Sequence, residues 1–201
     1  MQYLIGIDEA GRGPLAGPVS VGAVMVPHDF DFELLRGARD SKKLSEKKRE
    51  EWYERLLHMK SDGVLNFAVA LSPAASIDEE GIVPAIRSAL SRCLDELRAS
   101  PEACEIRLDG SLFAPDTFPN QKTIIRGDDT EPVISIASIA AKVTRDRYMM
   151  SMATQYPTYR FDEHKGYGTA AHRRLIAEHG FCEIHRRSFC TRLTVGTAEE
   201  A

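Results

Sequence analysis

The sequence contains no apolar run of 18 residues, the length that a membrane-spanning helix requires, so no membrane association is expected. The first residues also lack the basic start of a secretory signal peptide and reach two acids, Asp8 and Glu9, by position nine. The four cysteines form no Cys-x-x-Cys pair. Together these absences predict a cytoplasmic protein whose cysteines are reduced thiols.

Internal repeats and low-complexity tracts are absent as well, and the composition, 43% hydrophobic and 28% charged, is typical of a globular protein. A chain of 201 residues is long enough to bury a core without disulfides or a structural metal. We expect one domain over residues 1–192 and a frayed tail over residues 193–201, where no periodicity remains.

Charge is distributed unevenly along the chain. The net charge of −4 by itself argues against a nucleic-acid partner. However, residues 1–138 contain 16 basic and 23 acidic residues, whereas residues 139–192 contain 10 basic and 5 acidic residues. An acidic body beside a basic segment could hold metal ions on one part and a polyanion on the other. Two solvated surfaces of unequal sign would give the same pattern.

Hydrophobic periodicity predicts five strands, at residues 3–7, 19–26, 64–70, 105–108 and 123–125. It also predicts four helices, at residues 45–59, 83–97, 134–152 and 169–179, with Ser45 and Thr169 as N-caps and Gly180 as the final stop. The order of these elements predicts an α/β fold with a mixed five-stranded sheet flanked by helices. A basic, helical C-terminal part begins at about residue 139.

Four acids lie at or just after predicted strand ends. Asp8 and Glu9 follow the first strand, Asp109 follows the fourth, and Asp128 follows the fifth after a short turn. In open α/β sheets this edge is where ligands bind, and gathered carboxylates repel one another unless a cation neutralises them. Oxygen ligands of this kind suit Mg²⁺ or Mn²⁺. Acids that merely terminate strands in turns are the alternative.

Glycines and prolines dominate the segment that follows Asp8 and Glu9. A dinucleotide-binding loop would need a helix directly after these glycines, but Pro14 and Pro18 intervene and a valine-rich strand follows. The dinucleotide interpretation therefore fails. What remains is a glycine-lined loop beside two acids, where the backbone can approach a ligand closely.

The run Gly-Ile-Asp-Glu-Ala-Gly-Arg-Gly-Pro-Leu-Ala-Gly-Pro-Val at residues 6–19 closely resembles the signature of ribonuclease HII. Further blocks that resemble this family follow in family order, at residues 40–45, 109–110, 126–128, 137–147, 164–169 and 185–189. Two positions depart from the family pattern: Arg126 stands where a lysine is usual, and Ile136 where an alanine is usual. Neither is a carboxylate.

The resemblance implies the ribonuclease H-like fold and a metal-dependent endonuclease. Such an enzyme hydrolyses the RNA strand of RNA–DNA hybrids and cuts 5′ of single ribonucleotides in duplex DNA, leaving a 5′-phosphate and a 3′-hydroxyl. The resemblance assigns Asp8, Glu9, Asp109 and Asp128 as catalytic metal ligands for two Mg²⁺ or Mn²⁺ ions. It also implies ribonucleotide-containing nucleic acid as the partner, and we expect a monomer. Asp129 and Asp146 are rival acids, and we expect Asp146, beside two arginines, to have a solvated structural role.

The resemblance also suggests substrate contacts. Gly11, Arg12 and Gly13 would present backbone groups to the ribose 2′-hydroxyl, which distinguishes RNA from DNA. Tyr167 would lay its ring on the sugar of the next deoxynucleotide, although a half-buried ring at a turn is the plain alternative. The candidate phosphate contacts are basic side chains, some of which must be surface charge only: Lys42, Lys142, Arg145, Lys165, Arg186 and Arg187.

Several alternatives stay open. His179, Cys182, His185 and Cys190 have the ligand types of a zinc site, but core-like residues interleave with them and the resemblance assigns no zinc there, so we favour a structural role. A non-catalytic nucleic-acid-binding module is disfavoured because four bare acids would repel phosphate. A DNA-only phosphodiesterase of the same fold, such as a Holliday-junction or transposon nuclease, would have no evident use for Tyr167 or for the Gly-Arg-Gly loop.

Overall fold

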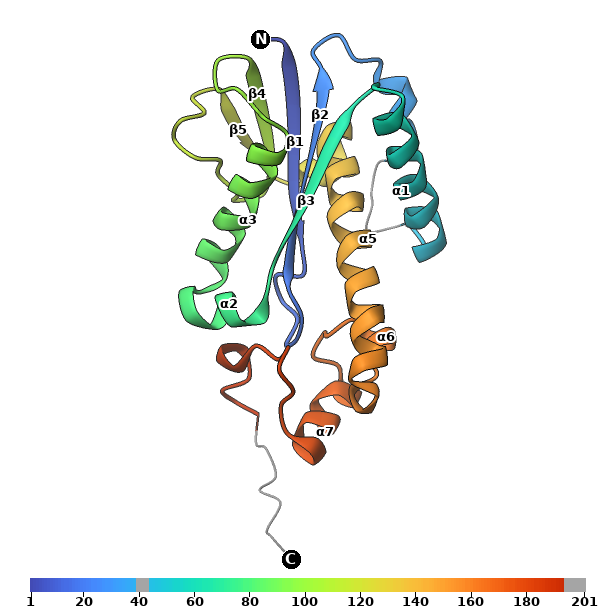
Figure 1. Cartoon of the computed structure of the whole chain (residues 1–201), viewed down its shortest axis with the longest axis vertical. Coiled ribbons are helices and arrows are strands. Elements are labelled where there is room, and N and C mark those ends of the chain that lie inside the picture. Colours follow the sequence, from blue (N-terminus) through green and yellow to red (C-terminus); the bar gives the residue numbers. More distant parts are fainter. Residues whose placement is uncertain (39–43, 194–201) are drawn as a thin grey trace, which may run out of the picture.

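A computed structural model describes residues 1–38 and 44–193. In this part of the chain, five strands form one sheet in the order β3-β2-β1-β4-β5 (Figure 1). The strands are β1 (Tyr3–Ala10), β2 (Val19–Pro27), β3 (Asn66–Ser72), β4 (Cys104–Asp109) and β5 (Gln121–Ile124). β1–β2 and β2–β3 pair antiparallel, whereas β1–β4 and β4–β5 pair parallel. The predicted mixed five-stranded sheet is confirmed.

The described helices are α1 (Glu46–Ser61), α2 (Ala74–Glu80), α3 (Ile82–Glu96), α4 (Gly127–Thr130), α5 (Pro132–Gln155), α6 (Phe161–His164) and α7 (Ala170–His179). The four helices expected from periodicity are α1, α3, α5 and α7, and the side chains of Ser45 and Thr169 cap α1 and α7 as predicted. The other three have seven residues or fewer, too short for periodicity to reveal. Lys42 and the tail from residue 194 lie outside the described residues.

Helices cover both faces of the sheet (Figure 1). Alternate strand residues point to opposite faces, so Ile5 packs in the same cluster as α2 and α3, whereas Leu4 packs with α1 and α5. α5 lies especially close to the sheet at two glycines. A Cβ on Gly6 would lie 2.4 Å from the backbone of Val133, and one on Gly22 would lie 2.4 Å from the Ala137 carbonyl oxygen. These two positions fix where the long helix lies on the sheet.

The C-terminal segment, with α6 and α7, lies below the carboxyl end of β1 in the view of Figure 1. It has a small core of its own around Met149, Tyr159 and Phe161, which also includes Ala16 from the β1–β2 connection. An isolated β-bridge joins Ala16 to His185. The predicted helical C-terminal part is therefore attached to the loop that follows Asp8 and Glu9.

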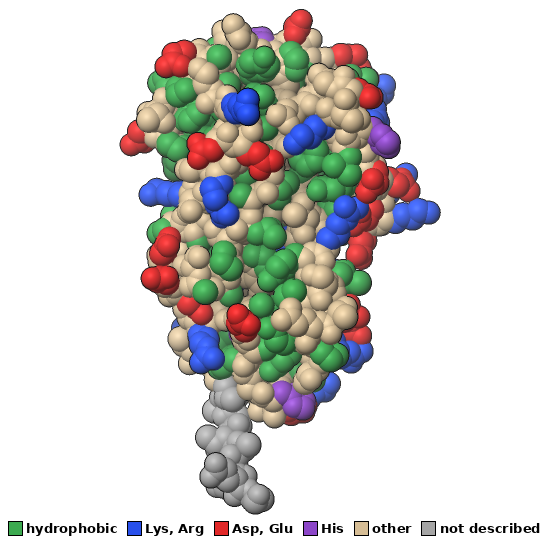
Figure 2. Space-filling model, in the orientation of Figure 1, with side chains coloured by type: hydrophobic (Ala, Val, Ile, Leu, Met, Phe, Trp, Pro, Cys, Tyr) green, Lys and Arg blue, Asp and Glu red, His purple; other side chains and the backbone are tan. Residues whose placement is uncertain are grey.

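Charged side chains of both signs are interspersed over the face shown in Figure 2, with no single-sign patch. The uneven charge along the sequence therefore does not become two separate surfaces on this face. Among the described residues, no helix has the length and apolar character needed to cross a membrane.

Candidate active site

Three carboxylates, those of Asp8, Glu9 and Asp109, line one cavity where β1 and β4 end. The two strands are parallel neighbours with Ile7 opposite Leu108, so Asp8 and Asp109 follow side by side at one sheet edge. Asp8 is only 4% exposed and accepts hydrogen bonds from the Glu9 N–H at 2.8 Å and from Ser138. Burial raises the pKa of Asp8 well above its ordinary value, and the charges of Glu9 and Asp109 raise it further. Like charges are thus gathered at this edge, as the sequence predicted.

The fourth predicted acid, Asp128, approaches Asp109 through its backbone N–H. Gly127 donates its N–H to Asp109 Oδ1 at 2.7 Å, and the Asp128 N–H lies 3.4 Å from the same oxygen. The Asp128 side chain is buried, and its carbonyl accepts a hydrogen bond from Ser135 Oγ. The rival Asp129 is held 2.7 Å from Arg126 in an ion pair on the outer side of the turn. The local geometry therefore joins Asp128, more than Asp129, to the Asp109 edge.

A cavity of about 540 Å³ opens over these strand ends. Its lining combines acids of the sheet edge with the glycine loop (residues 11–17) and with side chains from three other elements. The lining residues are Asp8, Glu9, Ala10, Gly11, Arg12, Gly13, Arg49, Asp109, Ser138, Lys142 and Tyr167. Three of the four predicted acids, the three predicted loop residues, Lys142 and Tyr167 thus share one space.

Two polar side chains of the lining, those of Arg49 and Ser138, were not predicted. Arg49 lies on α1, where it donates to the Leu44 carbonyl, and in the sequence it is one of many charges on an exposed helix. Ser138 lies one helical turn before Lys142 on α5, inside the block of residues 137–147. Its spacing from Lys142 is the signal that could have placed both on one face of the helix.

The donor set of the cavity fits a hard divalent cation. Asp8, Glu9 and Asp109 supply carboxylate oxygens, and their mutual repulsion is what a cation would relieve. The side chains do not yet converge: across residues 1–38 and 44–193, no three His, Cys, Asp or Glu side chains stand close enough to hold a metal.

Two buried arginines, Arg145 and Arg186, hydrogen-bond to backbone carbonyls in and next to the glycine loop. Arg145 donates to the carbonyl oxygens of Pro18, Ala16 and Lys165 at 2.9–3.1 Å. Arg186 donates to those of Gly17, Arg12 and Gly11 at 2.7–3.0 Å. Both arginines are 0% exposed.

The expectation that these two arginines contact phosphate is therefore wrong. Their guanidinium groups are occupied by backbone carbonyls in the interior. Burial lowers the pKa of Arg145, and it lowers the pKa of Arg186 to about 9 with a smaller contribution from the charge of Arg145. Arg145 and Arg186 instead fix the shape of the loop that carries Gly11, Arg12 and Gly13.

Of the other basic residues considered as phosphate contacts, Lys142 lines the cavity, whereas Lys165 and Arg187 do not. Lys142 reaches the cavity, where its ammonium lies 5.7 Å from the Tyr167 ring centre and 2.8 Å from Asp146. Lys165 is not part of the lining: its ammonium binds the Asp162 carbonyl. Arg187 is exposed, with its guanidinium 5.8 Å over the ring of Phe181, and is also not part of the lining.

Asp146 corrects a further expectation. It is 6% exposed and ion-paired with Lys142, so its role is structural, as predicted, but not solvated. The partly exposed Tyr167, at 42%, faces the cavity from the loop between α6 and α7.

Of the four residues considered for zinc, only Cys182 and His185 are in contact with each other among the interactions of the described residues. Cys182 Sγ lies 3.1 Å from His185 Nδ1, but the second ring nitrogen of His185 faces His172. His179 lies at the surface, 3.8 Å from Glu178. Cys190 is buried and takes no part in the contact between Cys182 and His185.

Comparison with known proteins agrees with the geometry. The family model for ribonuclease HII matches residues 5–192. Ribonuclease HII of Caldicellulosiruptor saccharolyticus is 42% identical over 94% of this chain and 87% of its own, and that of Endomicrobium trichonymphae is 45% identical over 92% and 83%. The crystal structure of ribonuclease H2 from Pyrococcus horikoshii OT3 superposes with a TM-score of 0.72 at 27% identity, covering 92% of this chain and 93% of that one. The chain therefore belongs to the ribonuclease HII family of metal-dependent endoribonucleases, which act on RNA–DNA hybrids.

Proposed function

We propose that this chain hydrolyses the RNA strand of RNA–DNA hybrids and also cuts 5′ of single ribonucleotides in duplex DNA, leaving a 5′-phosphate and a 3′-hydroxyl. One observation carries this proposal: the acids of the sheet edge, the glycine loop and Tyr167 line the same cavity. The acids serve hydrolysis of any phosphodiester, whereas the loop and the ring offer contacts to sugars.

Asp8, Glu9 and Asp109 would hold the divalent cations, and Asp128 would join them from the adjoining turn. Two bound Mg²⁺ or Mn²⁺ ions would activate the attacking water and stabilise the leaving 3′ oxygen. The backbone of Gly11, Arg12 and Gly13 binds the ribose 2′-hydroxyl in this proposal. Arg12 is also held 3.1 Å from Glu9 by an ion pair, which ties the loop to the acids.

Residues 1–192 act as a single catalytic domain in this proposal. The N-terminal part supplies Asp8, Glu9 and the glycine loop, and the C-terminal part supplies Tyr167. The hydrogen bonds of Arg186 to Gly11 and Arg12 hold the two parts together.

The direct test compares three duplexes: DNA with one embedded ribonucleotide, an RNA–DNA hybrid, and DNA alone. Each is incubated with Mg²⁺, with Mn²⁺ and with EDTA, and the ends of the products are identified. We expect cleavage of the first two with either cation and none with EDTA. Equal cleavage of the all-DNA duplex would favour a general phosphodiesterase of this fold and refute the proposal.

Substrate affinity should depend on salt through the basic side chains of the cavity. Arg49→Gln is expected to flatten the slope of log K against log salt concentration by about 0.9, the value for one lost phosphate contact. Arg55→Gln is the matched control, because Arg55 lies on the same helix but stacks on Trp52, 4.7 Å from its ring centre. Binding is measured with the all-DNA duplex and the RNA–DNA hybrid between 50 and 200 mM salt. Equal slopes for the two variants would mean that Arg49 contacts no phosphate.

A further inference from the structure

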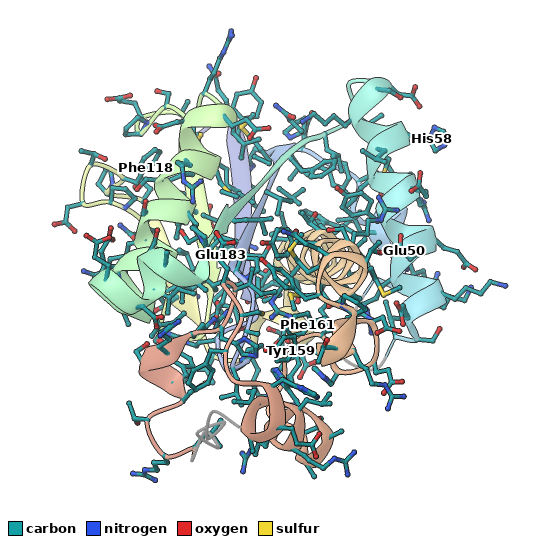
Figure 3. The ribbon with its side chains drawn as sticks, turned by 60° about the horizontal axis from the view of Figure 1, so that its bottom comes forward. Glu50, His58, Phe118, Tyr159, Phe161 and Glu183 are labelled. Carbon is teal, nitrogen blue, oxygen red and sulfur yellow. The ribbon has the colours of Figure 1, made fainter. Side chains whose placement is uncertain are left out.

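Three histidines, His164, His172 and His185, form a cluster next to the loop that carries Tyr167, outside the lining of the active-site cavity. The ring of His164 stacks on that of His172 with centres 4.2 Å apart, and His172 Nε2 lies 3.1 Å from His185 Nε2. Tyr159 packs edge-on against His185, and Phe161 packs edge-on against His172. Figure 3 labels Tyr159 and Phe161, which lie close together. His172 and His185 are 0% and 2% exposed.

Backbone partners determine which ring nitrogen carries each proton. His172 Nδ1 lies 3.0 Å from the carbonyl oxygen of Tyr167, which can only accept, so Nδ1 is protonated. His185 Nδ1 accepts a hydrogen bond from the Cys182 N–H at 2.9 Å, so this nitrogen carries no proton. In the neutral rings, Nε2 of His172 is then an acceptor and Nε2 of His185 is a donor. The two nitrogens that face each other are therefore complementary.

Burial favours these neutral forms. It is the largest cause that lowers the pKa of His172 to about 4 and the pKa of His185 to about 4. The charge of His164 lowers the pKa of His172 further, and the charge of Arg187 lowers that of His185. A second proton on His172 would place two donors face to face across 3.1 Å. A second proton on His185 would go to its Nδ1 and face the Cys182 N–H across 2.9 Å, so either protonation would break one hydrogen bond of this cluster.

The chain of hydrogen bonds ends on the backbone that presents Tyr167. This short loop follows Lys165 and Gly166, which both have positive φ, at 49° and 82°. His164 supports the same loop from the other side: its Nε2 donates to the Tyr159 carbonyl, and its Nδ1 accepts the Gly166 N–H at 3.2 Å. The Gly166 carbonyl in turn accepts the N–H of Leu15 at 2.8 Å, which joins the loop to the glycine loop.

We propose that His185 and His172 form a proton-ordered chain, Cys182 N–H to His185 to His172 to the Tyr167 carbonyl, that positions the Tyr167 ring in the active-site cavity. His172 and His185 are then positioning residues, and this role rests on the function proposed above for Tyr167. Substrate discrimination depends on their tautomers although neither ring lines the cavity.

The tautomers are tested first, without any substrate. Long-range ¹H–¹⁵N correlation spectra of the ¹⁵N-labelled chain at pH 7 are expected to show His172 protonated at Nδ1 and His185 protonated at Nε2. Spectra of His172→Asn assign the signals. A charged ring at either position, or the opposite tautomer of His172, overturns the proposal whatever the kinetics.

Kinetics then test the positioning role with the duplex that carries one ribonucleotide. His172→Gln, which loses the donor to the Tyr167 carbonyl, is expected to lower kcat about tenfold, within the range for a lost buried hydrogen bond. His172→Asn keeps an N–H near the position of Nδ1 and should restore most of this loss. His179→Gln, an exposed histidine on the same helix, is the matched control and should match the wild type.

A double mutant separates positioning from loss of stability. In a Tyr167→Ala background, adding His172→Gln should change kcat by less than about twofold, because the ring that it positions is already gone. A further tenfold loss in that background would overturn the positioning role. Wild-type cleavage by Tyr167→Ala alone would instead refute the junction role proposed for Tyr167, while the tautomers would still report on the hydrogen-bond chain.

Discussion

Asp8→Asn is expected to lower cleavage of the embedded-ribonucleotide duplex by more than about a hundredfold. Loss of a residue that only supports a metal ligand costs up to about a hundredfold, and loss of a ligand itself should cost more. The same loss is expected for Asp109→Asn, because both acids line the cavity at the shared edge of β1 and β4. Initial rates with saturating Mn²⁺ provide the measurement. Glu105→Gln is the control, since Glu105 lies on β4 but pairs with Arg107 outside the cavity. Near-wild-type rates for Asp8→Asn would refute the assignment.

In the metal-free protein, Asp8→Asn should raise the stability of the fold although it lowers activity. The raised pKa of Asp8 means that the folded chain retains this proton to a higher pH than the unfolded chain does. The metal-free protein therefore loses stability as pH rises from the ordinary aspartate pKa through the raised one. At pH 7 in EDTA, Asp8→Asn should melt at least about 2 °C above the wild type, the shift that 1 kcal/mol gives at this chain length.

Adding Mn²⁺ should reverse this order. The wild type should gain more in melting temperature than Asp8→Asn, because a bound cation relieves the repulsion among Asp8, Glu9 and Asp109 and stabilises only the folded chain. Differential scanning fluorimetry with and without Mn²⁺ measures both shifts. Identical gains in the two proteins would mean that Asp8 holds no metal.

Tyr167→Ala is expected to lower cleavage at the single embedded ribonucleotide by about ten- to a hundredfold, the effect of losing one stacking contact. Tyr167 is 42% exposed and lines the cavity, and packing of its ring on the next sugar would accept deoxyribose but crowd a 2′-hydroxyl. The loss should therefore be larger on this substrate than on a uniform RNA–DNA hybrid. Rates on the two substrates are compared at equal Mn²⁺ concentration.

Two further variants sharpen this result. Tyr167→Phe should retain most of the activity if the ring makes the contact, whereas a loss equal to that of alanine would assign the role to the hydroxyl. Tyr3→Ala removes a tyrosine of similar exposure, 37%, at the opposite end of β1, and should leave both rates unchanged. Wild-type cleavage by Tyr167→Ala would show that the ring is only structural.

The sheet and the acids could be predicted because they depend on local patterns. Alternation and apolar runs indicate the strands, and the acids at the ends of neighbouring parallel strands meet without any knowledge of side-chain contacts. α2 was missed because seven residues give barely two helical turns. Arg49 was missed because nothing in the sequence distinguishes it from the solvated charges beside it on α1.

Arg145 and Arg186 show why the remainder could not be predicted. An arginine in a basic segment is normally at the surface, so a contact with phosphate was the natural expectation. The actual partners of the two guanidinium groups are six carbonyl oxygens. Five of these belong to residues 11–18, at least 127 residues away in the sequence, and the sixth belongs to Lys165. Only the fold brings those carbonyls together, because the backbone of a Gly- and Pro-rich loop has few partners of its own.

The hydrogen bonds of Arg186 also set an order of events during synthesis. Their acceptors, the carbonyls of Gly11, Arg12 and Gly17, precede the arginine by 169 to 175 residues. At a translation rate of about 5–20 residues per second, Arg186 is synthesised about nine to thirty-five seconds after the loop. Such distant contacts close late in folding, because the loss of chain entropy precedes their gain. A nascent chain thus carries Asp8 and Glu9 long before the loop beside them can take its final shape, which requires that Arg186 has been synthesised.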